Sequence, residues 1–248
     1  MDASKVTWLL GQTPLFSGLS EAARSDIVTG GAQLTFDKGR TIFAQGALGD
    51  RLFVLLEGVV KEIVHSPRGD LVELVRLRAP ASFGEVAALD GMPRSASAEA
   101  VTGCALISVT AERMRRLLRA DADMRIALLH QFGELVRQAN RLAIDQVFLP
   151  TPDRVVRKLL DLYEANELGG PQRVTQTELA HMVGGARQTV NQVLRQLEGR
   201  ELIKVAHGQV EILDPEQLRR RINGRTGGFT SLVGHARPRL TRSTSAAE

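Results

Sequence analysis

The chain has 248 residues, enough for two domains of ordinary size, and 43% of them are hydrophobic, enough to bury a core. Its 32 basic and 28 acidic side chains give a net charge of +4, which is compatible with a polyanionic partner but does not establish one. The single cysteine, Cys104, excludes an internal disulfide and any site built from several thiolates, and it fits a reducing cytoplasm.

The N-terminus predicts neither a signal peptide nor a membrane anchor. Position 2 is acidic, and no basic segment leads into an apolar one. The longest aliphatic–aromatic run, residues 52–56, is far shorter than the roughly 20 residues that cross a bilayer. We therefore expect a cytoplasmic protein with no membrane partner.

Residues 33–109 have the pattern of a β domain. Segments such as 51–66 and 70–79 are rich in Val, Leu and Ile with partial alternation, and turn-forming Gly, Pro and Asp separate them. Strand-length pieces at this spacing predict a small barrel or a double-sheet roll. A short helix capped by Ser20 is expected before the roll.

Residues 110–149 predict a helical segment, since Gly and Pro are almost absent and helix formers dominate. Apolar residues at steps of four and three form a narrow stripe along it: Leu128, Phe132, Leu135, Ala139 and Leu142. A stripe this narrow is typical of the seam between two helices, so we expect a homodimer. The alternative is a helix that packs on its own domain. Pro150 and Pro152 predict a domain boundary.

Residues 150–222 predict a compact DNA-binding unit. A helix begins after Thr151, a second helix spans 175–183 with a Thr175–Glu178 capping box, and a glycine turn leads into a third helix over 186–199. A hairpin follows, so the layout is that of a winged helix-turn-helix. The tail over 223–248 has few large apolar residues, and we expect it to be disordered and basic.

The helix over 186–199 carries polar side chains that suit base edges in a major groove. Arg can bind guanine in bidentate fashion, while Gln and Asn suit adenine. The candidates for base contact are Arg187, Gln188, Asn191 and Gln192. The candidates for phosphate contact are Thr177, Thr189, Arg195, Lys204 and His207. The alternative is a polar face that meets only water.

The segment FGEVAALDGMPRSA, residues 83–96, places an acid, an arginine and a hydroxyl around a short helix. Gly84 and Glu85 begin this helix, and its first amides lack intrahelical partners and attract an anion. Arg94 and Ser95 add a charged fork and a hydroxyl for phosphate oxygens, whereas Glu85 suits a sugar hydroxyl. Together they indicate a bound nucleotide. The alternative is a structural Glu85–Arg94 ion pair.

Three segments of the chain resemble one protein family. FGEVAALDGMPRSA resembles the phosphate-binding cassette of cyclic-nucleotide-binding domains, and GDRLFVLLEGVVK (49–61) resembles the glycine signature that precedes it. ARQTVNQVLRQLEGRELIKVAHG (186–208) resembles the recognition helix and wing of the CRP/FNR family of bacterial transcription regulators. The likeness covers roughly residues 10–220. It implies an α+β fold with a cyclic-nucleotide-binding β-roll over 1–109, a dimerisation helix within 110–149 and a winged helix-turn-helix over 150–222.

The resemblance also assigns ligand contacts by position, with cyclic AMP as the expected ligand. Glu85 would meet the ribose hydroxyl, and Arg94 and Ser95 the cyclic phosphate. The remaining contacts would be backbone groups of Gly84, Val86 and Ala96, the base-lining Val75 and Leu77, and Asn140 on the dimer helix. Ala139 replaces a hydroxyl that is common in the family, and the alternatives are weaker cyclic AMP binding, a different base preference or a change in how binding reaches the DNA-binding domains. Gln188 stands where the family usually has Glu, so the common half-site of the family is not assumed for this chain.

We thus expect a homodimeric transcription regulator that binds double-stranded DNA and a cyclic nucleotide, with RNA polymerase as a candidate further partner. The alternative is a DNA-binding regulator of the same fold whose roll senses another ligand or none. An enzyme is not expected, because the sequence has no nucleophile–base pairing, metal-ligand spacing or phosphate-binding loop typical of nucleotide hydrolases. No metal and no catalytic cofactor are predicted.

Overall fold

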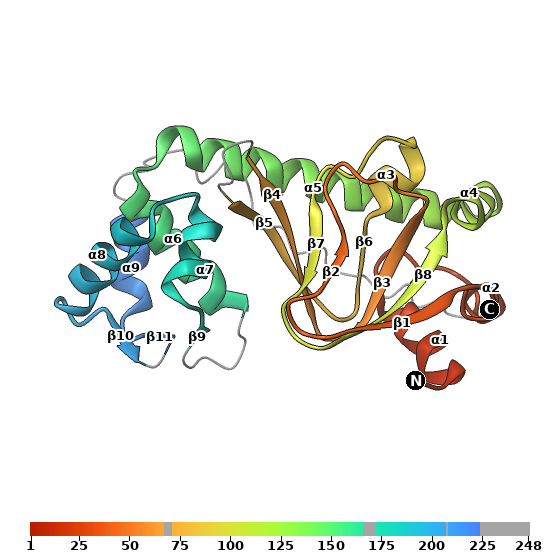
Figure 1. Cartoon of the computed structure of the whole chain (residues 1–248), viewed down its shortest axis with the longest axis horizontal. Coiled ribbons are helices and arrows are strands. Elements are labelled where there is room, and N and C mark those ends of the chain that lie inside the picture. Colours follow the sequence, from red (N-terminus) through yellow and green to blue (C-terminus); the bar gives the residue numbers. More distant parts are fainter. Residues whose placement is uncertain (67–70, 166–171, 207, 224–248) are drawn as a thin grey trace, which may run out of the picture.

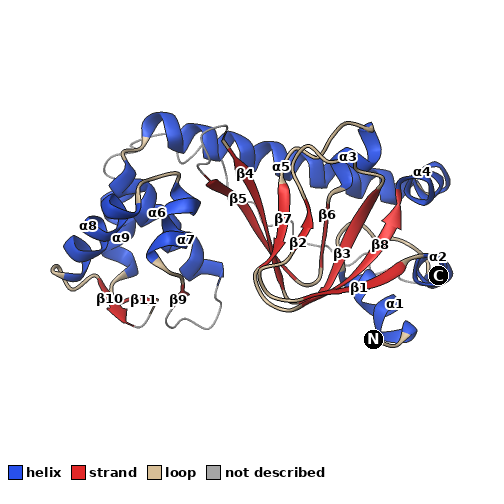
Figure 2. Cartoon of the chain, in the orientation of Figure 1, coloured by secondary structure: helices blue, strands red, loops and turns tan. Residues whose placement is uncertain are grey.

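The computed structural model describes residues 1–66, 71–165, 172–206 and 208–223, and its fold is the predicted α+β fold. A β-roll with helices at its N-terminal end is joined by one long helix to a smaller helical domain (Figure 1). Figure 2 shows that the strands of the roll and those of the smaller domain belong to separate sheets. Within the described residues, none of the helices combines the length and apolar character that a membrane span requires.

The roll consists of two four-stranded antiparallel sheets that face each other. One sheet has the order β1-β8-β3-β6 and the other β2-β7-β4-β5. The strands are β1 (Ala32–Phe36), β2 (Thr41–Phe43), β3 (Arg51–Glu57), β4 (Val59–His65), β5 (Leu71–Arg78), β6 (Ala81–Phe83), β7 (Ser97–Ala100) and β8 (Cys104–Thr110). The double-sheet roll predicted from the strand spacing is therefore confirmed.

The position of strand β3 between two cores explains why its sequence is apolar without a clear alternation. Phe53 and Leu55 lie in the core between the two sheets. Leu52 and Val54 belong instead to a second core, which the first sheet forms with the surrounding helices. Both faces of the strand are thus covered, and a strand buried on both faces reads as a continuous apolar run.

Helices that precede and follow the strands pack around the roll. The expected helix after Ser20 is α2 (Glu21–Gly30), but α1 (Ala3–Gln12) precedes it and is capped by Asp2. The helical segment over 110–149 consists of two helices: α4 (Ala111–Ala120) ends at Asp121, whose side chain accepts from Met124 N and caps α5 (Ala122–Phe148). A turn between α4 and α5 lets both pack on the same core.

The C-terminal domain has its own hydrophobic core and one more helix and strand than predicted. Its elements are α6 (Thr151–Ala165), β9 (Gln172–Arg173), α7 (Gln176–Val183), α8 (Arg187–Glu198), β10 (Ile203–Ala206), β11 (Gln209–Ile212) and α9 (Pro215–Asn223). The wing is a three-stranded sheet of order β10-β11-β9 rather than a two-stranded hairpin, because β9 pairs with β11. Of the tail predicted over 223–248, Asn223 is the last residue of α9, and residues 224–248 lie outside the described residues.

Gly58 and Gly39 offer a test of the roll's packing, since both have positive φ, at 95° and 81°. A Cβ at Gly58 would collide with the carbonyl oxygen of Gly103 and lie 2.9 Å from Cys104 Sγ, whereas a Cβ at Gly39 would meet nothing within 4 Å. We expect Gly39→Ala to lower the free energy of unfolding by about 1–2 kcal/mol through the backbone alone, and Gly58→Ala by at least about 3 kcal/mol. Urea unfolding of both variants checks this, and equal losses would contradict the packing described.

Candidate functional site

The segment over residues 83–96 forms a short helix followed by a return to the roll. Helix α3 (Glu85–Asp90) starts after Gly84, which has φ 76°, and ends at Gly91, which has φ 74°. A side chain at Gly84 would place its Cβ 2.8 Å from Arg94 Nη1 and 3.2 Å from Phe43 Cε1. Glycine is therefore required at position 84 both for its backbone conformation and for the close approach of Arg94.

Arg94 is almost completely buried beside the start of α3. Its Nη1 donates to Gly84 O and its Nη2 to Arg51 O, both at 2.6 Å. The guanidinium carbon lies 4.2 Å from the centroid of the Phe43 ring, a cation–π contact. Nε has no partner among the described residues. Burial lowers the pKa of Arg94, while the acidic side chains around it, Asp50 first, act to raise it.

Glu85 is 3% exposed and has one satisfied and one unsatisfied oxygen. Oε1 accepts a hydrogen bond from Gln131 Nε2 at 2.9 Å, and Oε2 has no partner among the described residues. Burial raises the pKa of Glu85, and a backbone hydrogen bond, Gln131 and Arg94 each partly offset this effect. The site thus buries one acceptor and one donor that lack partners, an arrangement that a bound ligand would complete.

The alternative interpretation of this segment was a structural ion pair, and the described contacts do not contain one between Glu85 and Arg94. Arg94 is held by two carbonyl groups and Glu85 by an amide. The two charged groups influence each other only through space. Both side chains thus remain available at the site.

The structure adds Gln131, which the sequence did not single out. It stands on α5 and accepts from Ser82 Oγ at 3.2 Å while donating to Glu85, so it links the helix to the roll. One feature of the sequence could have indicated Gln131. It is a polar residue beside Leu128 and Phe132, on the face of α5 that packs on the domain core.

A second acidic residue, Glu62 on β4, was also missed. It lies opposite Val75 of β5 and Ala98 of β7. The pKa of Glu62 is raised to about 7, mainly by burial and also by the nearby Glu85, while Arg94 acts to lower it. In the sequence Glu62 stands inside an apolar strand, and nothing local distinguished it from a solvent-facing residue.

The other predicted ligand contacts lie around this cluster at different depths. Val75 and Leu77 are half-buried on β5, Ala96 is buried, and Ser95 and Val86 are exposed. Asn140 is exposed on α5. It follows Gln131 and Gln138, the two residues whose side-chain amides connect that helix to the roll. The structure brings Gly84, Glu85 and Arg94 together, and the role of Asn140 stays a prediction.

The predicted stripe on α5 needs a correction at Leu128. This residue is 8% exposed and belongs to the core of its own domain, together with Met124, so it is not available to a second chain. Phe132 packs partly on the same core, Leu135 and Leu142 are half-buried, and Ala139 is exposed. The large apolar residues that α5 exposes are Ile126, Leu129, Val136, Val147 and Phe148. The role of Leu135, Ala139 and Leu142 in a dimer stays a prediction.

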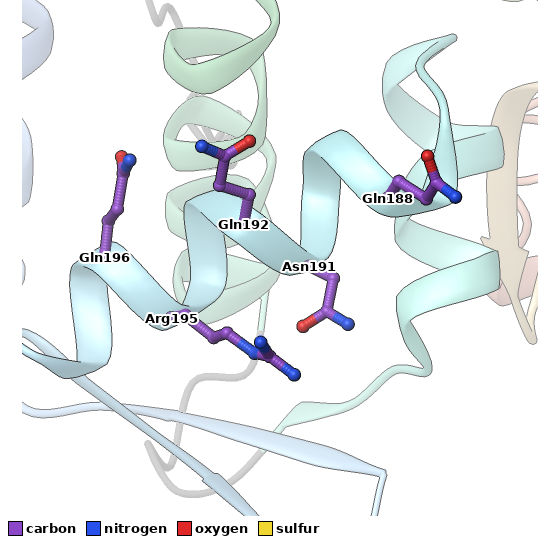
Figure 3. A pocket seen from close by; sticks show the side chains of 5 residues that line it. All are labelled: Gln188, Asn191, Gln192, Arg195 and Gln196. Carbon is purple, nitrogen blue, oxygen red and sulfur yellow. The ribbon is translucent and has the colours of Figure 1, made fainter.

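Helix α8 combines an apolar side with a polar one. Val190, Val193, Leu194 and Leu197 are buried in the domain core. Gln188, Asn191, Gln192, Arg195 and Gln196 line a pocket of about 360 Å³ on the other side (Figure 3). The N-cap residue is Ala186, which makes no side-chain hydrogen bond to the first amides of the helix. These amides are therefore open to an anion.

The predicted phosphate contacts are distributed between α7, α8 and the wing. Thr177 and Arg187 line a second pocket between the start of α7, α8 and the hairpin. The predicted capping box of α7 is confirmed, with Glu178 N donating to Thr175 Oγ1 and Thr175 N donating to Glu178. Lys204 and Arg195 are exposed and Thr189 is half-buried, whereas His207 lies outside the described residues. Gln196 is an addition to the predicted polar face.

No three His, Cys, Asp or Glu side chains lie close enough to hold a metal ion within the ranges that the structure describes.

Two family models match the chain. One, described as "Cyclic nucleotide-binding domain", matches residues 33–121, and the other, described as "Crp-like helix-turn-helix domain", matches residues 153–221. A CRP-like cAMP-activated global transcriptional regulator of Mycobacterium tuberculosis is 31% identical over 220 residues, which are 86% of this chain and 98% of that protein. A cAMP-activated global transcriptional regulator of Pasteurella multocida is 27% identical over 70% of this chain and 85% of that protein.

Solved structures show the same fold. A CRP/FNR-family transcriptional regulator of Thermus thermophilus matches with a TM-score of 0.67 and 26% identity, over 78% of this chain and 100% of that chain. A c-di-GMP-responsive global regulator of Xanthomonas campestris matches with a TM-score of 0.71 and 23% identity, over 78% of this chain and 99% of that chain. The second likeness extends to the fold alone.

The Gln131–Glu85 hydrogen bond predicts a pH-dependent effect on stability. Because the pKa of Glu85 is raised in the folded state, its contribution to the free energy of unfolding is present at low pH and is lost as the pH rises through the folded pKa. Gln131→Leu removes a donor to the charged form and raises this pKa further. We expect a loss that is small in acid and grows to about 1.5–3 kcal/mol once Glu85 is ionised.

Gln138→Leu is the matched control, since Gln138 stands on the same helix and donates to the neutral Leu74 carbonyl at 3.1 Å. Its cost is expected to be the same at every pH. Urea unfolding of both variants over a pH series is the measurement. Parallel pH curves for the two variants would show that Gln131 does not stabilise the Glu85 carboxylate.

Proposed function

Since this chain belongs to the CRP family of cyclic-nucleotide-binding, DNA-binding transcription regulators, we propose that it acts as a homodimer whose DNA binding responds to cyclic AMP. The family consists of transcription regulators and not of enzymes. The observation that carries the proposal is the buried pair of unsatisfied groups, Glu85 Oε2 and Arg94 Nε, at the start of α3.

A cyclic nucleotide would satisfy both groups at once. Its phosphate would meet Arg94 with a charge-assisted hydrogen bond, along with the exposed Ser95 and the open amides at the start of α3. Its ribose hydroxyl would donate to the free oxygen of Glu85. The base would then lie toward Val75 and Leu77 of β5. A single buried arginine suits a ligand with a single phosphate.

Cyclic AMP is proposed ahead of other ligands because of the relatives. The proteins of Mycobacterium tuberculosis and Pasteurella multocida are both named as cAMP-activated. The fold alone does not choose the ligand, since a structural neighbour is c-di-GMP-responsive. The alternative within the same fold is therefore a regulator with another ligand, and binding measurements with cyclic AMP, cyclic GMP and c-di-GMP separate these cases.

The homodimer is proposed from the exposed face of α5. Leu129 and Val136 are 67% and 59% exposed and stand seven residues apart, a heptad step that places them on one face of the helix. The same face on a second copy of α5 is self-complementary, as a two-fold interface requires. Two α8 helices would then be available to successive major grooves, about 34 Å apart. Because its partner would be chromosomal DNA, we place the regulator in the bacterial cytoplasm.

The first side chains of α8 are proposed to read bases. Arg187 and Gln188 are exposed at the start of the helix, where side chains reach the groove floor, and Asn191 follows one turn later. Arg suits guanine, and Gln and Asn suit adenine. The exposed Lys204 on β10 and Thr177 on α7 suit phosphates on either side.

Replacing Arg94 tests the ligand site. Arg94→Ala removes charge-assisted hydrogen bonds worth roughly 1.5–3 kcal/mol each, so we expect the affinity for cyclic AMP to fall at least about tenfold. Isothermal titration is the measurement, with circular dichroism to confirm the fold. Arg116→Ala is the control, because Arg116 is an exposed arginine of α4 that pairs with Glu112. Unchanged affinity in a folded Arg94→Ala protein would refute the assignment of this pocket.

Replacing Arg187 tests the DNA-reading helix. Arg187→Ala is expected to cost about 1–3 kcal/mol at one base pair and to relax specificity there. Lys204→Ala is the comparison, expected to weaken binding to all sequences and to reduce the salt slope by about one. Selection from a random DNA pool, with and without cyclic AMP, gives both preferences. The assignment of Arg187 fails if the selected sequences are identical for the wild type and Arg187→Ala.

A further inference from the structure

Glu62 places a second carboxyl group in the proposed ligand pocket. We propose that Glu62 is a ligand-binding residue that carries a proton while the cyclic nucleotide is bound, so that ligand binding takes up a proton from solvent. This inference rests on the proposed function, because it requires an anionic cyclic nucleotide between β4, β5 and α3.

The strand pattern places Glu62 on the inner face of its sheet. Val60, two residues earlier on β4, is completely buried in the core between the sheets. Lys61, between them, forms an ion pair with Glu99 of β7 at 2.9 Å on the opposite face. Since side chains alternate along a strand, Glu62 shares the inner face with Val60 and with its cross-strand neighbours Val75 and Ala98.

Glu62 lies within electrostatic reach of the residues proposed to hold the ligand. Its carboxyl group interacts through space with both Glu85 and Arg94. It makes no hydrogen bond or ion pair with another side chain that the structure describes, whereas Glu85 accepts from Gln131 and from the backbone at the start of α3. Of the two acids, Glu62 is therefore the one whose ionised form is stabilised by no hydrogen bond from the described residues.

The charges that face Glu62 can be counted element by element. From α3 and the segment after it come Glu85 and Arg94, and behind Arg94 stand Asp50 and Arg51, which pair with each other. The neighbours on β5 and β7 are the uncharged Val75 and Ala98, and α5 contributes the neutral Gln131. Of the other charged residues on these strands, Lys61 pairs with Glu99 and Arg76 with Glu73, and Arg78 is exposed at the end of β5.

A bound cyclic phosphate would therefore be the third negative group beside one arginine. Like charges that lie close together in a poorly solvated site repel one another and raise the free energy of the complex. Protonation of one carboxyl group removes its part of this repulsion. Glu62 is already partly protonated near neutral pH, because its pKa in the free protein is about 7. The phosphate would raise it further. A neutral carboxyl group also offers one donor and one acceptor to the ligand, while a carboxylate can only accept.

The proton balance gives the direction of the pH effect. Below the pKa Glu62 is already protonated, and binding takes up nothing. Between the pKa of the free protein and the higher pKa of the complex, binding takes up part of one proton from solvent, so affinity falls as the pH rises through this range. If the ligand raises the pKa of Glu62 by about one unit, Kd increases roughly fivefold between about pH 6.5 and about pH 8.5.

Calorimetry of cyclic AMP binding to the full chain tests this directly. The titration is repeated near pH 7.5 in buffers of different ionisation enthalpy, because the slope of the observed enthalpy against that quantity counts the protons taken up. We expect roughly half a proton or more for the wild type. Glu62→Gln should still bind cyclic AMP, but with proton uptake near zero and a flat pH profile. Glu99→Gln, on the outer face of the neighbouring strand, should retain the wild-type uptake.

The outcomes separate this inference from the proposed function. If the wild type binds cyclic AMP without proton uptake, or if Glu62→Gln keeps the uptake, the role of Glu62 is refuted while the ligand assignment stands. If the wild type binds neither cyclic AMP nor cyclic GMP at any pH, the proposed function itself fails. If Glu62→Gln does not fold, Glu62→Ala replaces it in the same buffer series, and the absence of proton uptake by the wild type still refutes the role of Glu62.

Discussion

The proposed ligand site is organised around the buried guanidinium of Arg94. Its two hydrogen bonds to the carbonyls of Gly84 and Arg51 connect the start of α3 to strand β3, and the Phe43 ring covers its face. A buried cation is tolerated only with such partners. The glycine at position 84, the short helix and the turn at Gly91 all follow from the need to bring the chain back to this position.

Helix α5 connects the ligand site to the rest of the molecule. Three glutamines along it donate to different elements: Gln131 to Glu85, Gln138 to the Leu74 carbonyl and Gln146 to the Val183 carbonyl of α7. The same helix exposes Leu129 and Val136. The proposed ligand pocket, the proposed dimer face and the C-terminal domain thus all involve the same helix (Figure 1).

The electrostatics of the pocket set it apart from a simple phosphate site. A site for an anion would be expected to hold an excess of positive charge, yet two acids, Glu62 and Glu85, face a single arginine. Glu85 has a donor from α5 and a free oxygen that suits a hydroxyl group. Glu62 has no such donor, which is why we assign to it the uptake of a proton when the ligand binds.

Features that depend on neighbouring residues could be predicted from the amino-acid order alone. These include the roll of short strands, the capping box at Thr175 and Glu178, the glycine that starts α3 and the winged helix-turn-helix layout. Propensity, capping and turn chemistry act within a few residues, so they can be read without a fold. The folded chain was needed to show that α5 begins after Asp121, that Leu128 is buried while Leu129 is exposed, and that Gln131 and Glu62 meet the pocket. Each of these depends on which face of an element meets residues far away in the chain, and a local pattern does not contain that information.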